Sequence, residues 1–340
     1  MPGSVSFANW SLSWSIPWGW GGGLVISKAS FGNQLVLFKG TAPFVIVPYH
    51  GGQPVFKDGL QNHGAPFTPV LPTSANAPQG LGTPTASNDN QWDPIGNPSG
   101  AVVVEKRAPT ALEPAALVIW AKLQCANYQY VHHWEFRADG SIEASVGLGG
   151  RLWQNPAPSS NHVHNFYFRL DVDMAGAANN AVQEFSHPNN NLSSDAWTTI
   201  SAEGKRSANS ARATKWRVVN KAPKPNGMVR SYEITPGSDM GPDGTFSTGD
   251  LWVLAYDGSQ DGGAVGTNDS VLASSYLHPG TNVDGADIVV WVCLRHHHQT
   301  RAMGEETITL PYEFLSFHME PRDFLDATPT NLYATNPPSP

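Results

Sequence analysis

Apolar and polar residues alternate in short runs along most of the chain, and this period of two predicts β-strands rather than helices. In the first half the runs cover residues 24–27, 34–38, 44–49, 101–106, 117–134, 142–148 and 166–172. In the second half they cover residues 198–200, 214–219, 229–234, 250–256, 287–294 and 314–319. Only residues 269–276 show a helical period. The pattern predicts an all-β protein.

Turn residues between these runs predict antiparallel hairpins. Gly32-Asn33 separates two runs, and Ala138-Asp139-Gly140-Ser141 and the segment 223–227 separate two further pairs. Residues 50–100 are rich in Gly, Pro, Asn and Ser, which predicts a long loop that shapes a functional site. Because no internal repeat interrupts the pattern, we expect one large antiparallel β-sandwich over residues 1–340.

The composition of the chain argues against some classes of binding partner. The 340 residues include 20 Lys and Arg and 28 Asp and Glu, a net charge of −8, which argues against nucleic acid or an anionic membrane as a partner. Only 14% of residues are charged, whereas 33 Gly and 28 Pro favour strands and loops. No apolar run reaches the length of about 18 residues that a membrane helix needs. No secretory signal opens the sequence, so we expect a cytoplasmic location.

The two cysteines, Cys125 and Cys293, lie inside apolar runs. We expect both to be buried free thiols, which behave as small hydrophobic residues. A disulfide between them requires close Cα atoms, and spacing along the sequence does not test that.

Three groups of histidines carry the candidate chemistry. His162 and His164 are two residues apart, so a strand would point both rings to the same face. The triplet 296–298 follows an apolar run, and the pair 132–133 lies within another. Neutral imidazole suits Cu, Zn, Fe or Ni. With Tyr128 on a buried run, the sequence suggests a metal beside an aromatic ring that it could oxidise.

The motifs around these residues stand in a recognisable order. In chain order they are Asn127-Tyr128-Gln129-Tyr130, Trp134-Glu135-Phe136, Asp139-Gly140-Ser141-Ile142-Glu143, His162-Val163-His164, Arg169-Leu170-Asp171-Val172-Asp173, Trp216-Arg217-Val218-Val219-Asn220, Asp287-Ile288-Val289-Val290-Trp291 and Pro321-Arg322-Asp323-Phe324. Together they resemble the catalytic domain of the copper-containing amine oxidases, which convert one of their own tyrosines into the quinone cofactor topaquinone. The resemblance runs from about residue 10 to residue 329 and lacks the small N-terminal domains of most relatives.

The resemblance implies specific roles. Tyr128, preceded by Asn127, is the expected precursor of topaquinone. Cu²⁺ is expected on His162, His164 and His298, the last lying seven residues beyond the tryptophan of its motif. The tyrosine that hydrogen-bonds the quinone in the family corresponds to Tyr49. The implied reaction converts a primary amine, O2 and water into an aldehyde, ammonia and hydrogen peroxide, and relatives imply a homodimer.

The resemblance also implies a structural ion, Ca²⁺, bound through oxygen atoms. The matching ligands are the carboxylates of Asp171, Asp173 and Asp287 and the carbonyls of Val172 and Ile288. Hard oxygen ligands suit this ion. Carboxylates that simply face solvent are the alternative.

Two departures from the family pattern leave the reaction open. Gln129 stands where the family has an acidic residue. The family's general base lies fourteen residues after the tyrosine matched by Tyr49, and that position is His63; Asp58 serves if the loop is shorter. A second hypothesis is therefore a copper oxidase, oxygenase, lyase or cyclase with Tyr128 unmodified, and a third is a non-catalytic relative.

Overall fold

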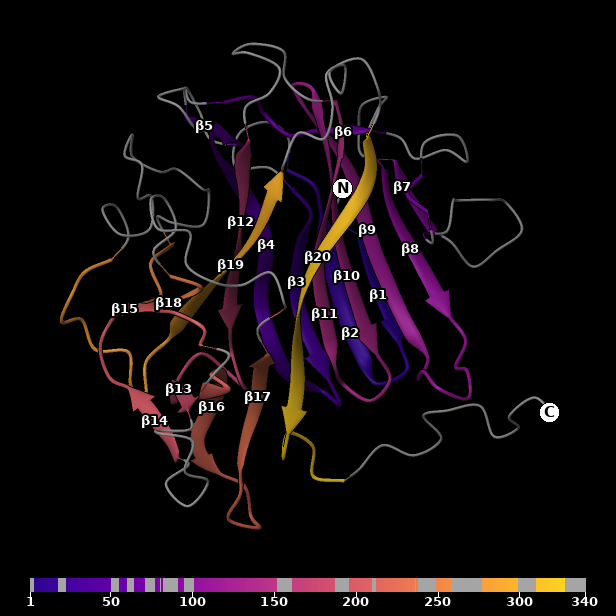
Figure 1. Cartoon of the computed structure of the whole chain (residues 1–340). Helices are drawn as coiled ribbons and strands as arrows, with labels where there is room; N and C mark the ends of the chain where they lie inside the picture. Colours follow the sequence, from indigo (N-terminus) through magenta and orange to yellow (C-terminus); the bar gives the residue numbers. More distant parts are fainter. Residues whose placement is uncertain are drawn as a thin grey trace.

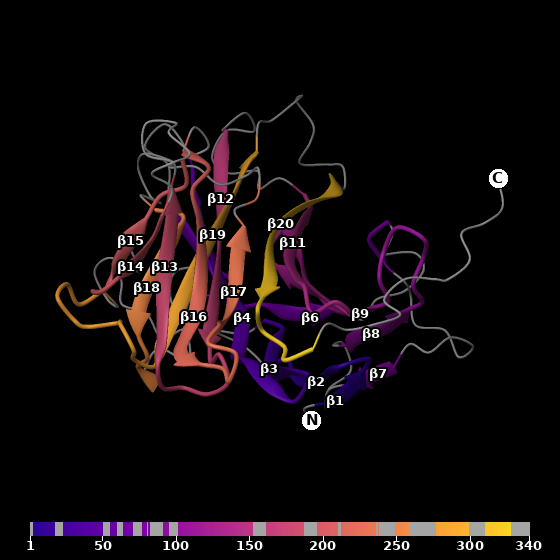
Figure 2. The same ribbon diagram turned by 90° about the horizontal axis from the view of Figure 1, so that it is seen from below.

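Two antiparallel sheets form the molecule (Figures 1 and 2). The structure is a computed structural model. It describes residues 3–17, 23–49, 55–59, 64–70, 77–79, 81, 91–94, 101–151, 161–186, 196–209, 212–235, 237, 249–258, 277–298 and 310–327. This arrangement confirms the predicted all-β sandwich. Among the described residues, no helix is long and apolar enough to cross a membrane.

The first sheet has nine strands. In spatial order they are β1 (Gly3–Phe7), β2 (Trp10–Ser15), β3 (Val25–Phe31), β4 (Gln34–Pro48), β12 (His162–Val172), β19 (Ile288–His298), β18 (Leu251–Ala255) and β15 (Gly204–Arg206), and β5 (Val55–Asp58) pairs with β4. Strands β4, β12 and β19 are its centre, although they are distant in sequence (Figure 1).

The second sheet has eleven strands. In spatial order they are β14 (Ala196–Ile200), β13 (Asn180–Ser186), β16 (Lys215–Pro223), β17 (Val229–Thr235), β20 (Leu310–Arg322), β11 (Ile142–Gly150), β10 (Tyr128–Arg137), β9 (Ala116–Cys125), β8 (Ala101–Arg107) and β7 (Gln91–Pro94), and β6 (Thr68–Val70) pairs with β9.

One apolar core lies between the sheets. Phe168 of the first sheet contacts Trp134 and Phe317 of the second, with ring centroids 6.0 and 5.2 Å apart. All three side chains are fully buried. Aromatic side chains of this size each bury about 150–250 Å², so this layer holds the two sheets together.

The prediction for residues 117–134 was wrong, because this run is two strands rather than one. Strands β9 and β10 form a tight hairpin in which Tyr128 pairs with Cys125. Ala126 in the turn has a positive φ of 48°. Asn127 is the one residue of the sequence that marks this turn, since Ala126 stands where Gly or Asn is usual at such a backbone angle. The hairpin places Tyr128 at the start of a strand.

Several strand boundaries also differ from the prediction. The runs 34–38 and 44–49 belong to the single strand β4, and residues 50–100, expected as loop, contain β5, β6 and β7. Strand β13 was not predicted, and it separates β14 from β16. The histidine triplet continues β19 rather than following it. The expected helical segment 269–276 lies outside the described residues.

Other local predictions are confirmed. Gly32 and Asn33 have φ of 57° and 64°, which a two-residue hairpin of type I′ requires. Strands β10 and β11 pair across the turn at 138–141. Cys125 and Cys293 are buried free thiols.

Candidate active site

The register between β12 and β19 creates a histidine cluster at one end of the first sheet. His162 pairs directly with His298 across the two strands. His164 lies two residues further along β12 and therefore points to the same face as His162. All three rings are buried, the most accessible being His298 at 8%.

Three ring nitrogens of this cluster face one another. Nε2 of His162 lies 3.0 Å from Nε2 of His164 and 3.2 Å from Nδ1 of His298. The cluster as a whole offers one ligand atom per residue, all within 4.8 Å of one another. Two imidazoles bound at about 2.0–2.1 Å to a tetrahedral metal have nitrogens about 3.3 Å apart. The spacing therefore fits one metal ion with three histidine ligands.

The charge state of the cluster also fits a metal. Burial, and then the neighbouring His162 and His298, hold the pKa of His164 well below its ordinary value. A buried histidine with a lowered pKa is neutral, and neutral imidazole is the form that binds metals. The other members of the triplet differ: His297 is exposed, and Nε2 of His296 lies 3.2 Å from Oε2 of Glu313.

Tyr128 lies directly against this cluster from the opposite sheet. Its hydroxyl is 3.0 Å from Nε2 of His162 and 3.2 Å from the hydroxyl of Tyr49. Tyr49 in turn stacks on the His162 ring at a centroid distance of 4.2 Å. Burial raises the pKa of Tyr49 to about 12, so it remains a protonated hydroxyl at neutral pH. The structure thus brings together a phenol, its hydroxyl partner and the three histidines.

A carboxyl group completes the site. Asp58 lies at the end of β5, which pairs with β4 so that Asp58 is opposite Val45. With Tyr49, Asn127 and Tyr128 it lines a cavity of about 50 Å³ whose other walls are the apolar side chains 47, 56 and 126. Asp58 therefore shares the cavity with the tyrosine. His63, the other expected base, lies outside the described residues.

Burial sets the proton affinity of this carboxyl. Burial raises the pKa of Asp58 to about 6, while hydrogen bonds from Tyr130, Cys125 and the backbone of Ala65 act in the opposite direction. A base with a pKa slightly below neutrality is mostly ionised at pH 7 and still accepts a proton readily. Tyr130 and Cys125 were not among the residues selected from the sequence. The two-residue spacing from Tyr128 to Tyr130, which puts both on one face of a strand, was the available signal.

Gln129 points away from the site. Its amide nitrogen donates to Oε1 of Gln124 at 3.0 Å, and its amide oxygen accepts from the Tyr312 hydroxyl at 2.7 Å. These partners lie on the outer face of the second sheet. The missing acidic residue at this position therefore removes no charge from the cavity.

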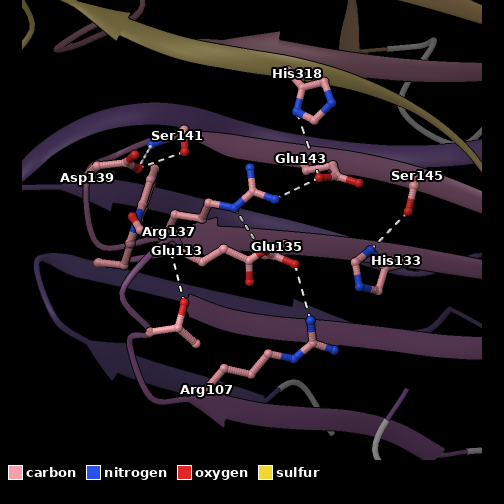
Figure 3. Close-up of polar contacts among 12 residues, drawn as sticks. Arg107, Glu113, His133, Glu135, Arg137, Asp139, Ser141, Glu143, Ser145 and His318 are labelled. Carbon is pink, nitrogen blue, oxygen red and sulfur yellow. Dashed lines mark hydrogen bonds and ion pairs between the residues drawn. The ribbon is translucent and has the colours of Figure 1, made fainter. Parts of the chain in front are cut away.

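The outer face of the second sheet carries a separate polar network (Figure 3). Glu135 binds both Arg107 and Arg137, and Arg137 also binds Glu143 at 2.8 Å. His133 bonds to Ser145 at 2.9 Å on this face, and burial lowers its pKa to about 4. On β10, His133, Glu135 and Arg137 alternate with inward-facing residues, so the network lies outside the candidate site.

His132 is inward-facing but takes no part in the histidine cluster. Its Nδ1 accepts a hydrogen bond from the backbone N–H of Leu24 at 3.3 Å, and burial lowers its pKa to about 3. The pair 132–133 is thus structural.

The predicted second ion site lies at the other end of β12. Asp171, Asp173 and Asp287 each offer a carboxylate oxygen, and these atoms lie within 4.8 Å of one another. Burial and the adjacent Asp287 raise the pKa of Asp173 to about 6. Nine residues of strand, about 30 Å, separate Asp171 from His162, so the two clusters are independent.

Comparisons with known proteins agree with this geometry. The family model described as copper amine oxidase, enzyme domain, matches residues 104–337. A peroxisomal copper-containing amine oxidase alpha 2 of Arabidopsis thaliana is 25% identical over 60% of this chain and 37% of its own length. The primary amine oxidase of Pisum sativum is 22% identical over 96% of this chain and 59% of its own. The chain therefore spans less than two thirds of these relatives.

The solved structure of a copper-containing benzylamine oxidase from Hansenula polymorpha shares the fold. Its TM-score with this chain is 0.71 at 16% sequence identity, covering 96% of this chain and 60% of that one. At this identity the likeness shows the arrangement of strands alone.

Proposed function

The chain belongs to the copper amine oxidase family, and from that premise we propose that it oxidises primary amines with O2 and water to aldehydes, ammonia and hydrogen peroxide. One observation carries the proposal: the Tyr128 hydroxyl lies 3.0 Å from a nitrogen of the buried three-histidine cluster. A phenol so placed is the side chain that a bound, oxygen-reactive metal would oxidise first.

His162, His164 and His298 are the residues that would hold copper, and Tyr128 is the residue that would become topaquinone. When present, the two groups supply an electron acceptor for the amine and a route for its electrons to O2. The chemistry of the donor set supports copper, since three neutral imidazoles suit Cu²⁺.

The remaining site residues handle the substrate. Asp58 removes a proton from the carbon beside the amine nitrogen, a role for which a pKa of about 6 leaves it ionised at pH 7. The Tyr49 hydroxyl hydrogen-bonds the Tyr128 oxygen and fixes the plane of its ring. The apolar walls of the cavity limit water around the reacting carbon.

Peroxide release tests the proposal. Protein loaded with Cu²⁺ in air should produce hydrogen peroxide from a simple primary amine such as benzylamine, and phenylhydrazine should give a coloured adduct. His298→Ala should lose copper and all peroxide production. His297→Ala is the matched control, because its side chain is exposed, and should retain both.

A second candidate keeps the metal but not the quinone. Asp58 lies nine residues after Tyr49, whereas the family spacing is fourteen, and this difference favours a copper oxidase, oxygenase, lyase or cyclase with Tyr128 unmodified. Copper-loaded protein that remains colourless and releases no peroxide would support it. Wild-type protein that binds no copper would favour a non-catalytic relative instead.

Four further proposals concern the rest of the molecule. We propose that the cluster of Asp171, Asp173 and Asp287, with the carbonyls of Val172 and Ile288, binds a structural Ca²⁺. The described chain forms a single catalytic domain and assembles as a homodimer, which light scattering of the purified protein would test. Cell fractionation would test its expected cytoplasmic location.

A further inference from the structure

The carboxyl of Asp58 lies among the Tyr130 hydroxyl, the Cys125 thiol and the backbone of Ala65. The Tyr130 hydroxyl donates to Oδ2 at 2.8 Å, and the Cys125 thiol and the backbone of Ala65 are its other partners. Tyr130 and Cys125 are fully buried, and Asp58 is 5% exposed. A buried carboxylate that accepts the Tyr130 hydrogen bond and packs against the other two groups cannot rotate freely, so its direction relative to the cavity is fixed by these neighbours.

The thiol is held by the turn that follows β5. Sγ of Cys125 lies 3.2 Å from the carbonyl oxygen of Ala65, which also accepts the N–H of Gly59 at 2.8 Å. Gly59 has a φ of 85°, and a Cβ there would lie 2.6 Å from the carbonyl oxygen of Pro43. This turn therefore requires glycine. Burial, and then the charge of Asp58, raise the pKa of Cys125, so the thiol keeps the proton that it donates to the carbonyl oxygen of Ala65.

Tyr130 also reaches the histidine cluster. Its hydroxyl lies 3.4 Å from Nδ1 of His164, the ring nitrogen opposite the one that faces His162. A histidine that presents Nε2 to a metal carries its proton on Nδ1 and donates it to a nearby oxygen. The Tyr130 oxygen can accept that proton while its own O–H donates to Asp58. One phenol thus connects the carboxyl with a metal-facing ring.

On the premise of the proposed amine oxidation, we propose that Cys125 and Tyr130 are positioning residues for the base. The Tyr130 hydroxyl donates to the Asp58 carboxyl and favours its ionised form, and it also links that carboxyl to His164. Cys125 holds the turn that fixes the carboxyl toward the cavity. In the described part of the chain, the titratable groups around this carboxyl are Tyr49 just after β4, Cys125 from β9, and Tyr128 and Tyr130 from β10. His164 on β12 reaches it through Tyr130.

The test measures the carboxyl itself in metal-free protein. Aspartate labelled with ¹³C at the carboxyl carbon is titrated by NMR, and Asp58→Asn identifies the resonance. We expect a wild-type pKa of about 6. Tyr130→Phe removes a donor to the ionised form and should raise that pKa by about one unit. Cys125→Ala should raise it by about a few tenths, because Cys125 lowers the pKa of Asp58 less than Tyr130 does.

The conservative variant separates positioning from packing. Cys125→Ser replaces the thiol with a stronger donor, so the pKa of Asp58 should return to the wild-type value or fall below it. Two matched controls exist elsewhere in the core. Cys293→Ala removes the other buried thiol, and Tyr232→Phe removes a buried hydroxyl that donates to the carbonyl of Gly140 at 2.9 Å. Both should leave the pKa unchanged.

The outcomes distinguish this proposal from the proposed function. If the pKa of Asp58 is the same in wild type, Tyr130→Phe and Cys125→Ala, or if the two control variants shift it as much, the positioning role is wrong. Since the titration uses neither copper nor amine, a protein that fails to oxidise amines contradicts the proposed function alone. In active protein, the acidic limb of kcat/KM should move with the NMR pKa in each variant.

Discussion

At the scale of single residues, the site depends on which face of a strand each side chain occupies. His162 and His164 could be paired from their two-residue spacing, and the same rule places Tyr128 beside Tyr130. The partner strand could not be derived in this way, because the pairing of His162 with His298 joins segments 136 residues apart. The sequence offered Asp58 and His63 as alternatives for the base. The structure shows Asp58 on β5, which pairs with β4, and lining the cavity.

The raised pKa of Asp58 makes a prediction about stability. A carboxyl whose pKa rises from 3.8 to about 6 on folding favours the folded state at low pH, and this contribution is lost as the pH rises through that window. Asp58→Asn has no such charge to bury. Relative to wild type, we expect its free energy of unfolding to increase by about 2.4 kcal/mol between about pH 4 and pH 8.

Urea unfolding of the metal-free proteins at the two pH values measures this difference. Asp326→Asn serves as the control, since that carboxyl is exposed and paired with Arg230 at 3.1 Å. A constant difference between wild type and Asp58→Asn across the pH range would show that the carboxyl is not held in a low-dielectric site.

At the scale of elements, periodicity identified most strands but not their ends. The run 117–134 contains no Gly or Pro, and its single Asn, Asn127, was the only mark of the hairpin at Ala126. Strand β13 was missed because its residues, Asn-Ala-Val-Gln-Glu-Phe-Ser, give a weak alternation between two stronger runs. In both cases tertiary pairing overrides the local signal. Turns with Gly at a positive φ, such as Gly32, were predicted correctly because the backbone angle selects the residue.

The hairpin that carries Tyr128 depends on one glycine of the neighbouring strand. Gly150 pairs with Tyr128, has a φ of 100°, and a Cβ there would lie 2.6 Å from the carbonyl oxygen of Asn127. Gly150→Ala should therefore displace the turn and lower the free energy of unfolding by about 3 kcal/mol or more.

Gly227→Ala separates backbone strain from this close approach. Gly227 has a φ of 82°, and no atom of the described residues lies within 4 Å of the position that an alanine methyl group would take. Its substitution should therefore cost about 1–2 kcal/mol, the strain of the backbone angle alone. Denaturant unfolding of both variants provides the comparison. Equal losses for the two would mean that the contact with Asn127 relaxes freely.

At the scale of the whole molecule, the three-histidine site joins the two sheets while the carboxylate cluster joins strands of one sheet. Tyr128 and Asp58 come from opposite sheets and share a cavity, so the site exists only when the sandwich is closed. The carboxylates of Asp171 and Asp173 follow one another along the end of β12, and Asp287 lies just before β19. An ion there would fix two central strands at the end remote from the histidines.

Calcium should therefore stabilise the folded protein. At a free Ca²⁺ concentration of about 100 times Kd, linkage gives about 2.7 kcal/mol of added stability, measurable as a rise in Tm. Asp173→Asn should abolish the rise. Asp284→Asn is the control: it removes a nearby ion pair with Lys221, and the rise in Tm should remain. A wild-type Tm that is independent of Ca²⁺ would show that the three carboxylates bind no ion.

The central claim is that a metal on three histidines oxidises the phenol beside it, and the mass of the peptide that carries Tyr128 tests this most directly. The protein is loaded with Cu²⁺, exposed to air and digested. Because formation of a quinone adds oxygen and removes hydrogen, the peptide should be heavier than its sequence mass, and His162→Ala should leave it unchanged. A wild-type peptide at its sequence mass, from protein shown to contain copper, would contradict the account.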